Sequence, residues 1–256
     1  GVQTCALPIF CKDLTIRACK YGMMISAGLL FSVAGNLGGE VFSILDPTIF
    51  SVAIFSKGGN AAGLAFFGFA LIIVARRYEF SAVPLLLSVG VLLVLTSFIW
   101  TGHAQKVGPI AQAVLSLHLV AIAFWLGSFL PLRRMCSSPE SENLYKIAER
   151  FGTHAIFYIC LLLISGLIFA YILIGDLSLL LSTVYGNVFL MKITLVSALL
   201  GVGAVNKFRL VPSMKLEPSI GAQRLRKSIQ IEMLIALLIL SFSGFLTTST
   251  TLPMGG

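Results

Sequence analysis

Histidines are the residues of this sequence best suited to bind a metal ion, because neutral imidazole binds copper, zinc and iron. Two of them lie in the stretch TGHAQKVGPIAQAVLSLHLVAIAFWLGSF, where His103 follows one long apolar run and His118 lies inside the next. An ionisable side chain among membrane-apolar residues is costly and usually functional, although a histidine can also simply hydrogen-bond to a neighbouring helix. The third, His154, lies in AERFGTHAIFY. We therefore take His103, His118 and His154 as candidate metal ligands.

The composition indicates the class of fold that positions these side chains. The chain of 256 residues is 57% hydrophobic and 11% charged, with a mean hydropathy of +0.98, whereas soluble domains have about 25% charged residues. Runs such as LLLSVGVLLVLTSFIW are apolar on every face and near the ~20 residues that cross a bilayer as a helix. A β-barrel would instead need alternating segments of about ten residues. The predicted fold is an all-α, polytopic transmembrane helical bundle.

About seven apolar segments are predicted as spans, near residues 21–38, 59–75, 82–100, 110–132, 153–174, 187–206 and 230–249. Most of the 18 basic residues flank the first segment or lie in the connections after the second, fourth and sixth. Positive residues favour the cytoplasmic side, so we expect a cytoplasmic N-terminus and a periplasmic or extracellular C-terminus. Since this topology explains the net charge of +8, no nucleic-acid partner is expected.

The topology assigns a depth to each histidine. His103 lies at the outer mouth, and His118 lies roughly 12 Å along the next helix at 1.5 Å per residue. His154 begins the fifth helix from the inner side, roughly 15 Å or more from His118 by the same rise. One metal ion or haem shared by His118 and His154 is therefore disfavoured, but the histidines could act as successive stations on one route.

Two further charges lie within the last two apolar segments. We expect Lys192 to extend to the outer interface, and Glu232 to meet Arg226 or Lys227 at the inner one. The five cysteines form no paired motif. The sequence contains no phosphate-binding loop, H-E-x-x-H or G-x-S-x-G, so we expect no enzyme and no ATPase.

The first nine residues, GVQTCALPI, read like the translation of a common sequencing-adapter DNA. We therefore expect residues 1–9 to be a foreign segment, and such a segment has no bearing on the fold. Residues 10–256 are predicted to form a single transmembrane helical domain.

Several motifs in order along the chain resemble the copper resistance D (CopD) family of bacterial inner-membrane proteins. They are GHA at 102–104, LHLVAIAFWLGSFLPL at 117–132, AERFGTHA at 148–155, STVYGNVFLMKI at 182–193, NKFRLVP at 206–212, LRKSIQIE at 225–232 and a final TTLP. The resemblance covers a core of about residues 80–253. It implies a copper-translocating bundle in the inner membrane, often of eight spans, which fits a chain truncated at its N-terminus.

The resemblance also implies a copper-binding periplasmic partner of the CopC type, and His103 and His118 as outer copper ligands. The family more often has serine and an apolar residue after RF, so RFGTH departs from its pattern and His154 is supported less. The predicted function is inner-membrane copper transport, by import, with the copper oxidation state open. The alternatives are a membrane haem protein or oxidoreductase with a buried histidine as axial ligand, and a structural subunit whose histidines only pack.

Overall fold

The computed structural model describes residues 2–78, 81–137, 143–174 and 183–248, and every element in these ranges is a helix. The chain divides into two compact units, residues Gly1–Gln112 and Ala113–Gly256. The predicted all-α, polytopic membrane fold is confirmed. Within these described ranges, six helices are long and apolar enough to cross a membrane, and the helix Val83–Ile99 is apolar but shorter.

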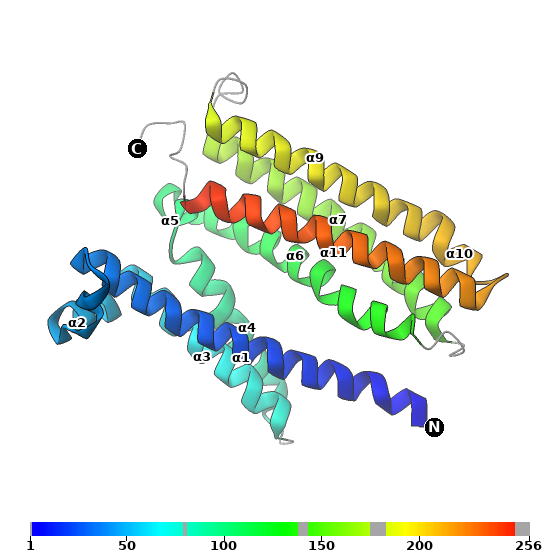
Figure 1. The fold of residues 1–256 in the computed structure, drawn as a ribbon, viewed down its shortest axis with the longest axis horizontal. Coiled ribbons are helices and arrows are strands. Elements are labelled where there is room, and N and C mark those ends of the chain that lie inside the picture. The colour runs from blue at the N-terminus through cyan, green and yellow to red at the C-terminus, as the bar shows by residue number, and fades with distance from the viewer. Residues whose placement is uncertain (1, 79–80, 138–142, 175–182, 249–256) are drawn as a thin grey trace. The chain divides into compact units, whose positions relative to one another are not determined.

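The described residues of the first unit form α-helices, which Figure 1 labels, and one short 3-10 helix. They are α1 (Val2–Gly38), the 3-10 helix η1 (Val41–Leu45), α2 (Pro47–Phe55), α3 (Lys57–Arg77), α4 (Val83–Ile99) and α5 (His103–Val107). Local chemistry sets the starts of two of them. The Asp46 carboxylate accepts a hydrogen bond from Thr48 N at 2.8 Å before α2, and Ser56 Oγ accepts one from Gly59 N at 3.1 Å before α3.

Close helix packing in this unit depends on glycine. A Cβ on Gly68 of α3 would lie 2.7 Å from Gly90 O, and one on Gly90 of α4 would lie 2.8 Å from Gly68 O. The two backbones are therefore in contact, as is typical of small residues between membrane helices.

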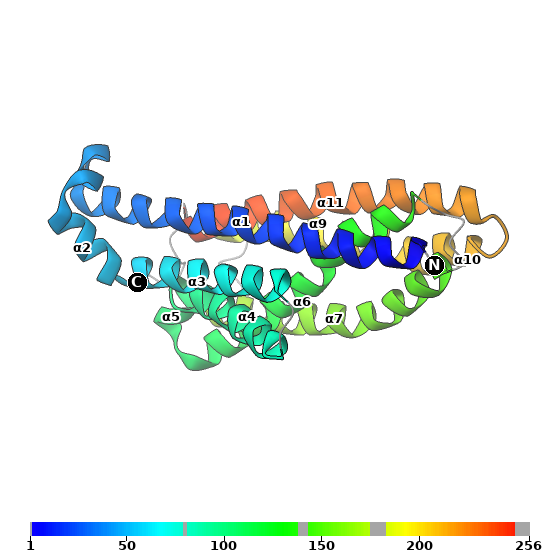
Figure 2. The ribbon, with the colours of Figure 1, turned by 90° about the horizontal axis from the view of Figure 1, so that it is seen from below.

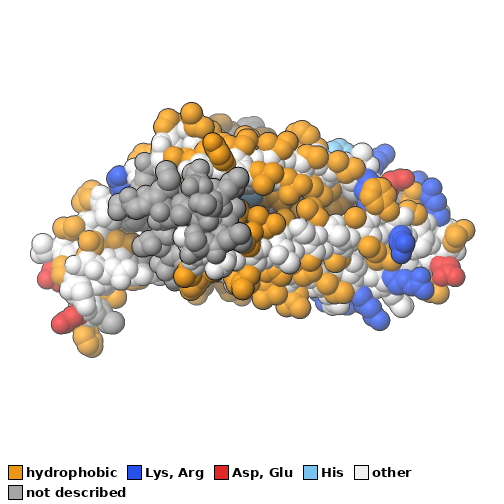
Figure 3. Space-filling model, turned by 90° about the horizontal axis from the view of Figure 1, so that it is seen from above, with side chains coloured by type: hydrophobic (Ala, Val, Ile, Leu, Met, Phe, Trp, Pro, Cys, Tyr) orange, Lys and Arg blue, Asp and Glu red, His pale blue; other side chains and the backbone are white. Residues whose placement is uncertain are grey.

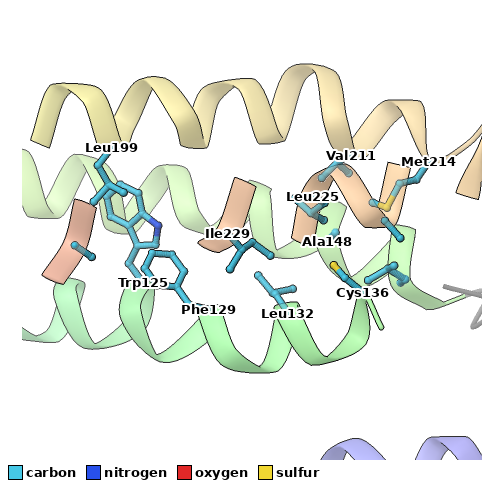
Figure 4. Close-up of a cluster of buried hydrophobic side chains, with 13 residues drawn as sticks. Trp125, Phe129, Leu132, Cys136, Ala148, Leu199, Val211, Met214, Leu225 and Ile229 are labelled. Atoms are coloured by element: carbon cyan, nitrogen blue, oxygen red, sulfur yellow. The ribbon is translucent and has the colours of Figure 1, made fainter. Parts of the chain in front are cut away.

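The second unit contains α6 (Pro109–Met135, which begins just before the unit boundary), α7 (Asn143–Ile174), α9 (Val184–Val205), the π-helical segment η2 (Asn206–Leu210), α10 (Val211–Ser213) and α11 (Pro218–Thr248). The four long helices α6, α7, α9 and α11 run alongside one another (Figures 1 and 2). Their common core includes Trp125 and Phe129 of α6, Leu199 of α9 and Ile229 of α11 (Figure 4).

Several helices extend beyond the predicted apolar segments. α7 begins at Asn143 and α11 at Pro218, because a helix can continue with charged turns where water solvates them. At this end of the second unit, Cys136 after α6, Leu144 of α7 and Met214 after α10 belong to one buried cluster. Its basic residues include Arg133, Arg134, Lys146, Arg150, Lys207, Arg209 and Lys215. We call this end of the second unit the basic end.

The surface has the polarity expected of a membrane protein. Apolar side chains cover much of the face drawn in Figure 3, and Lys and Arg side chains gather at one end of it. Many large apolar residues are exposed, among them Phe157, Leu167 and Tyr171 of α7. A helix that presents apolar side chains outward suits a lipid environment.

Candidate metal site and the polar groups around it

His118 is anchored to the neighbouring helix α7 through one ring nitrogen. Its Nδ1 lies 3.1 Å from Leu162 O and 3.2 Å from Ser165 Oγ. A carbonyl oxygen can only accept a hydrogen bond, so the hydrogen bonds assign the proton of the neutral ring to Nδ1. The Nε2 lone pair is then left for a ligand, and no hydrogen bond to Nε2 occurs among the described residues.

Two residues of α7 fix the position of the His118 ring. Ser165 is buried, and its hydroxyl donates to Leu161 O at 2.5 Å, so its oxygen is oriented to accept from the ring. A Cβ on Gly166 would lie 3.0 Å from His118 Cε1. Glycine at position 166 therefore lets the ring lie close against α7. Partners of this kind orient a histidine for metal binding.

Aromatic stacking holds the same two helices together closer to the basic end. The Phe124 ring of α6 stacks on Tyr158 of α7, with centroids 3.8 Å apart and planes inclined by 13°. Phe151 of α7 also stacks on the Phe124 ring, with centroids 5.6 Å apart. This stack supports the α6–α7 pairing on which the His118 anchor depends.

Lys192 of α9 lies near the histidine instead of extending only to the interface. Its side chain is half-buried, and its charge acts on His118. The sequence predicted an interfacial position for Lys192 and did not predict His118 as its neighbour. A fixed positive charge opposes the binding of a second cation nearby, so the pair His118–Lys192 favours weak or transient metal binding.

The structure does not bring the three predicted histidines together. His154 is exposed on α7, and its Nδ1 donates to Arg150 O of the same helix at 2.8 Å. The backbone of His103 begins α5, but its side chain lies outside the described part of the structure. Across the described residues, no three His, Cys, Asp or Glu side chains gather to hold a metal ion.

A second polar group, the pair Glu232 and Asn206, lies in the interior of the second unit, and the sequence predicted neither the burial of Glu232 nor its pairing with Asn206. Glu232 of α11 is 4% exposed and Asn206 is 8% exposed. The Asn206 side chain lies beside the Glu232 carboxyl group, within reach of a hydrogen bond, but Asn206 Oδ1 has no hydrogen-bond partner. The expected pairing of Glu232 with Arg226 or Lys227 is wrong, because both basic residues are exposed and the described residues contain no salt bridge to Glu232.

The fold and these interior polar groups define a class of protein. Apolar helices cross a membrane, and ionisable side chains are held inside the bundle that they form. The chain is a polytopic α-helical membrane protein with polar groups in its interior, an arrangement that marks pathways for ions or protons.

Comparison with known proteins finds two matches. Residues 145–246, less than half of the chain, match the family model "Copper resistance protein D", and this part of the chain is similar to that family. The match includes Ser165, Lys192, Asn206 and Glu232, whereas His118 and His103 precede it. It begins in α7 and ends in α11.

One curated relative is the "Copper transport protein CutJ" of Bacillus subtilis (strain 168). It is 26% identical over 212 residues, which are 76% of this chain and 39% of the relative. The chain thus spans well under half of that protein. No solved structure matches the chain.

Proposed function

We propose that this chain transports copper across the bacterial inner membrane, by import, and that His118 is its interior copper-binding station. The observation that carries the proposal is the anchored ring of His118, whose Nδ1 is held by α7 while Nε2 keeps its lone pair. The family and the relative's name, which both refer to copper, support copper as the cargo.

A transport site must bind its ion well enough to receive it and weakly enough to release it. A single imidazole beside the charge of Lys192 meets both conditions, whereas a closed set of four ligands would retain the ion. We therefore propose exchange between sparse ligands, without a catalytic step.

The route begins, in this proposal, at His103. Only α5 and Gly108 separate it from α6, which carries His118. Copper would pass from His103 to His118 and then toward the basic end, which we propose to face the cytoplasm because positive residues favour that side. A periplasmic CopC-like protein would deliver the ion. His154, exposed and bonded within its own helix, is the weakest candidate of the three.

The test is copper accumulation in bacterial cells that express the wild-type chain, His118→Ala or His154→Ala at matched membrane levels. We expect His118→Ala to lose most of the uptake and His154→Ala to retain most of it. Uptake by His118→Ala equal to wild type would exclude the central role of His118.

A visible absorption spectrum of the purified protein addresses the alternative. Haem ligated by His118 would give a strong Soret band that His118→Ala removes, and that result would replace copper transport by a haem function.

A further inference from the structure

The buried pair Glu232 and Asn206 is not explained by the His118 site. The two side chains lie on different helical segments, Glu232 in α11 and Asn206 at the start of η2. Trp125 of α6 lies two helical turns from His118 toward the basic end. A Cβ on Gly203 would lie 3.3 Å from Glu232 Oε1 and 3.7 Å from Trp125 Cζ2. The pair therefore lies apart from His118, closer to the basic end of the second unit.

The backbone at this point is irregular. α9 changes at Asn206 into the π-helical segment η2, and π-helical turns inside longer helices are frequent at functional sites. Gly203 leaves space for the carboxyl group, because a side chain there would meet Glu232 Oε1.

The charges around the pair do not compensate a carboxylate. Asn206 of η2 is the side-chain partner of the Glu232 carboxyl group, and Trp125 of α6 borders the same Gly203, and neither of them is charged. Lys207 is next in sequence to Asn206, and its Nζ donates a hydrogen bond to Gly152 O of α7 at 2.8 Å. On α11 itself, Arg226 and Lys227 are exposed.

An uncompensated charge inside a membrane protein is strongly disfavoured, so the carboxyl group must be neutralised by an ion or a proton. The surroundings of Asn206 Oδ1 indicate that a proton, and not an ion, neutralises the carboxyl group. This oxygen is a buried acceptor without a donor, and a buried acceptor left unpaired costs about 1–3 kcal/mol. A protonated carboxyl group supplies one O–H donor, whereas a carboxylate or a metal ion on it supplies none.

We infer that Glu232 and Asn206 form a proton-binding site inside the helix bundle, in which the Glu232 carboxyl O–H donates to Asn206 Oδ1 and the Asn206 amide donates to the other carboxyl oxygen. Release breaks the O–H bond, transfers the proton to water and leaves the carboxylate. If copper passes through the same bundle, which rests on the proposed function, release of this proton offsets the positive charge that enters.

Infrared spectroscopy of the purified full chain in lipid vesicles tests the site without copper. We expect a protonated-carboxyl C=O band at neutral pH that moves in D₂O and is lost in Glu232→Gln. Asn206→Leu should keep the band and shift it to higher frequency, because the hydrogen bond to Oδ1 is gone. Glu217→Gln is the matched control, since Glu217 is exposed beside α11, and it should leave the band unchanged. A wild-type spectrum without a band that Glu232→Gln removes would overturn the inference.

Copper uptake then separates this inference from the proposed function. We expect wild-type uptake to depend on pH, and Glu232→Gln to be folded but to have lost that dependence. A carboxyl band in a chain that moves no copper would contradict the proposed function alone. Wild-type copper uptake without the band would contradict the proton site alone.

Discussion

The Nδ1 atom of His118 lies 3.1 Å from the carbonyl oxygen of Leu162, which joins helix α6 to helix α7. The carbonyl belongs to a helix whose own serine, Ser165, lies at 3.2 Å from the same nitrogen. A ring held at one nitrogen by two acceptors presents the other nitrogen in a fixed direction. The α6–α7 pairing is therefore part of the candidate copper site, and changes in α7 should affect it.

Gly166→Ala should weaken copper binding without removing the histidine. The added Cβ would lie 3.0 Å from His118 Cε1 and 3.4 Å from Nδ1, so the ring must shift and its hydrogen bonds to α7 lengthen. Overpacking of this kind typically costs about 1–3 kcal/mol. Copper retained by the purified protein after dialysis measures the effect.

Gly201→Ala is the control for the Gly166 change, because no atom lies within 4 Å of a Cβ there. It introduces the same methyl group into a membrane helix of the second unit. Equal copper retention by Gly166→Ala, Gly201→Ala and wild type would show that the ring position does not matter.

Lys192→Leu should strengthen copper binding at His118. The change removes a positive charge that acts on the histidine and introduces no atom that binds copper, unlike the thioether of methionine. Removing a repulsion on the order of 1 kcal/mol, as for charges in a partly screened site, corresponds to roughly fivefold higher affinity. Titration of the purified protein with copper measures the change.

Tighter binding should also slow release, so Lys192→Leu should accumulate bound copper and transport less of it per unit time. Lys57→Leu is the matched control, since Lys57 is exposed at the start of α3 in the first unit. An affinity that falls in Lys192→Leu would mean that the lysine assists binding instead of opposing it.

The fold class could be predicted from the sequence because an apolar run of sufficient length has few alternatives in a bilayer. All seven predicted segments overlap helices, although the segment around Val83–Ile99 forms a shorter one. Helix ends were predicted less well, as in α11, which begins at Pro218. Its first turns are charged, and hydropathy does not detect a helix that continues into water.

The site was predicted only in part, since its contacts come from helix packing. The composition around His118 singles out the residue, but its partners Leu162 and Ser165 lie on another helix and carry no signal of their own. Glu232 was assigned to basic neighbours in sequence, whereas packing turns it toward Asn206. Asn206 is a polar residue at the end of an apolar segment, and this position was the one sign in the sequence of a polar partner for Glu232. The π-helical segment that Asn206 begins has no recognisable sequence pattern.

Gly90→Ala should destabilise the first unit. The new methyl group would lie 2.8 Å from Gly68 O, a backbone atom that can move only if α3 and α4 separate. We expect a loss of about 1–3 kcal/mol in the free energy of unfolding, as for overpacking in a close-packed interior. Gly63→Ala in α3, where no atom lies within 4 Å of the added Cβ, should change the stability little. Unfolding in mixed micelles with increasing denaturing detergent compares the two, and equal midpoints would argue against close contact of these backbones.

Cys136, which follows α6 at the basic end, should react very slowly with water-soluble thiol reagents. Burial raises the pKa of its thiol to about 11, and the nearby charge of Arg226 only partly opposes this shift. Only the thiolate reacts, so against the usual 9.0 the reactive fraction at pH 8 falls about 100-fold, tenfold per pKa unit. The rate of maleimide labelling at Cys136, measured by mass spectrometry, should rise with pH up to about 11 in the folded protein and be fast after denaturation. Rapid labelling of Cys136 at pH 8 in the folded protein would show that its buried position at the basic end opens to water. The packing of Cys136, Leu144 and Met214 would then not hold the helix ends together.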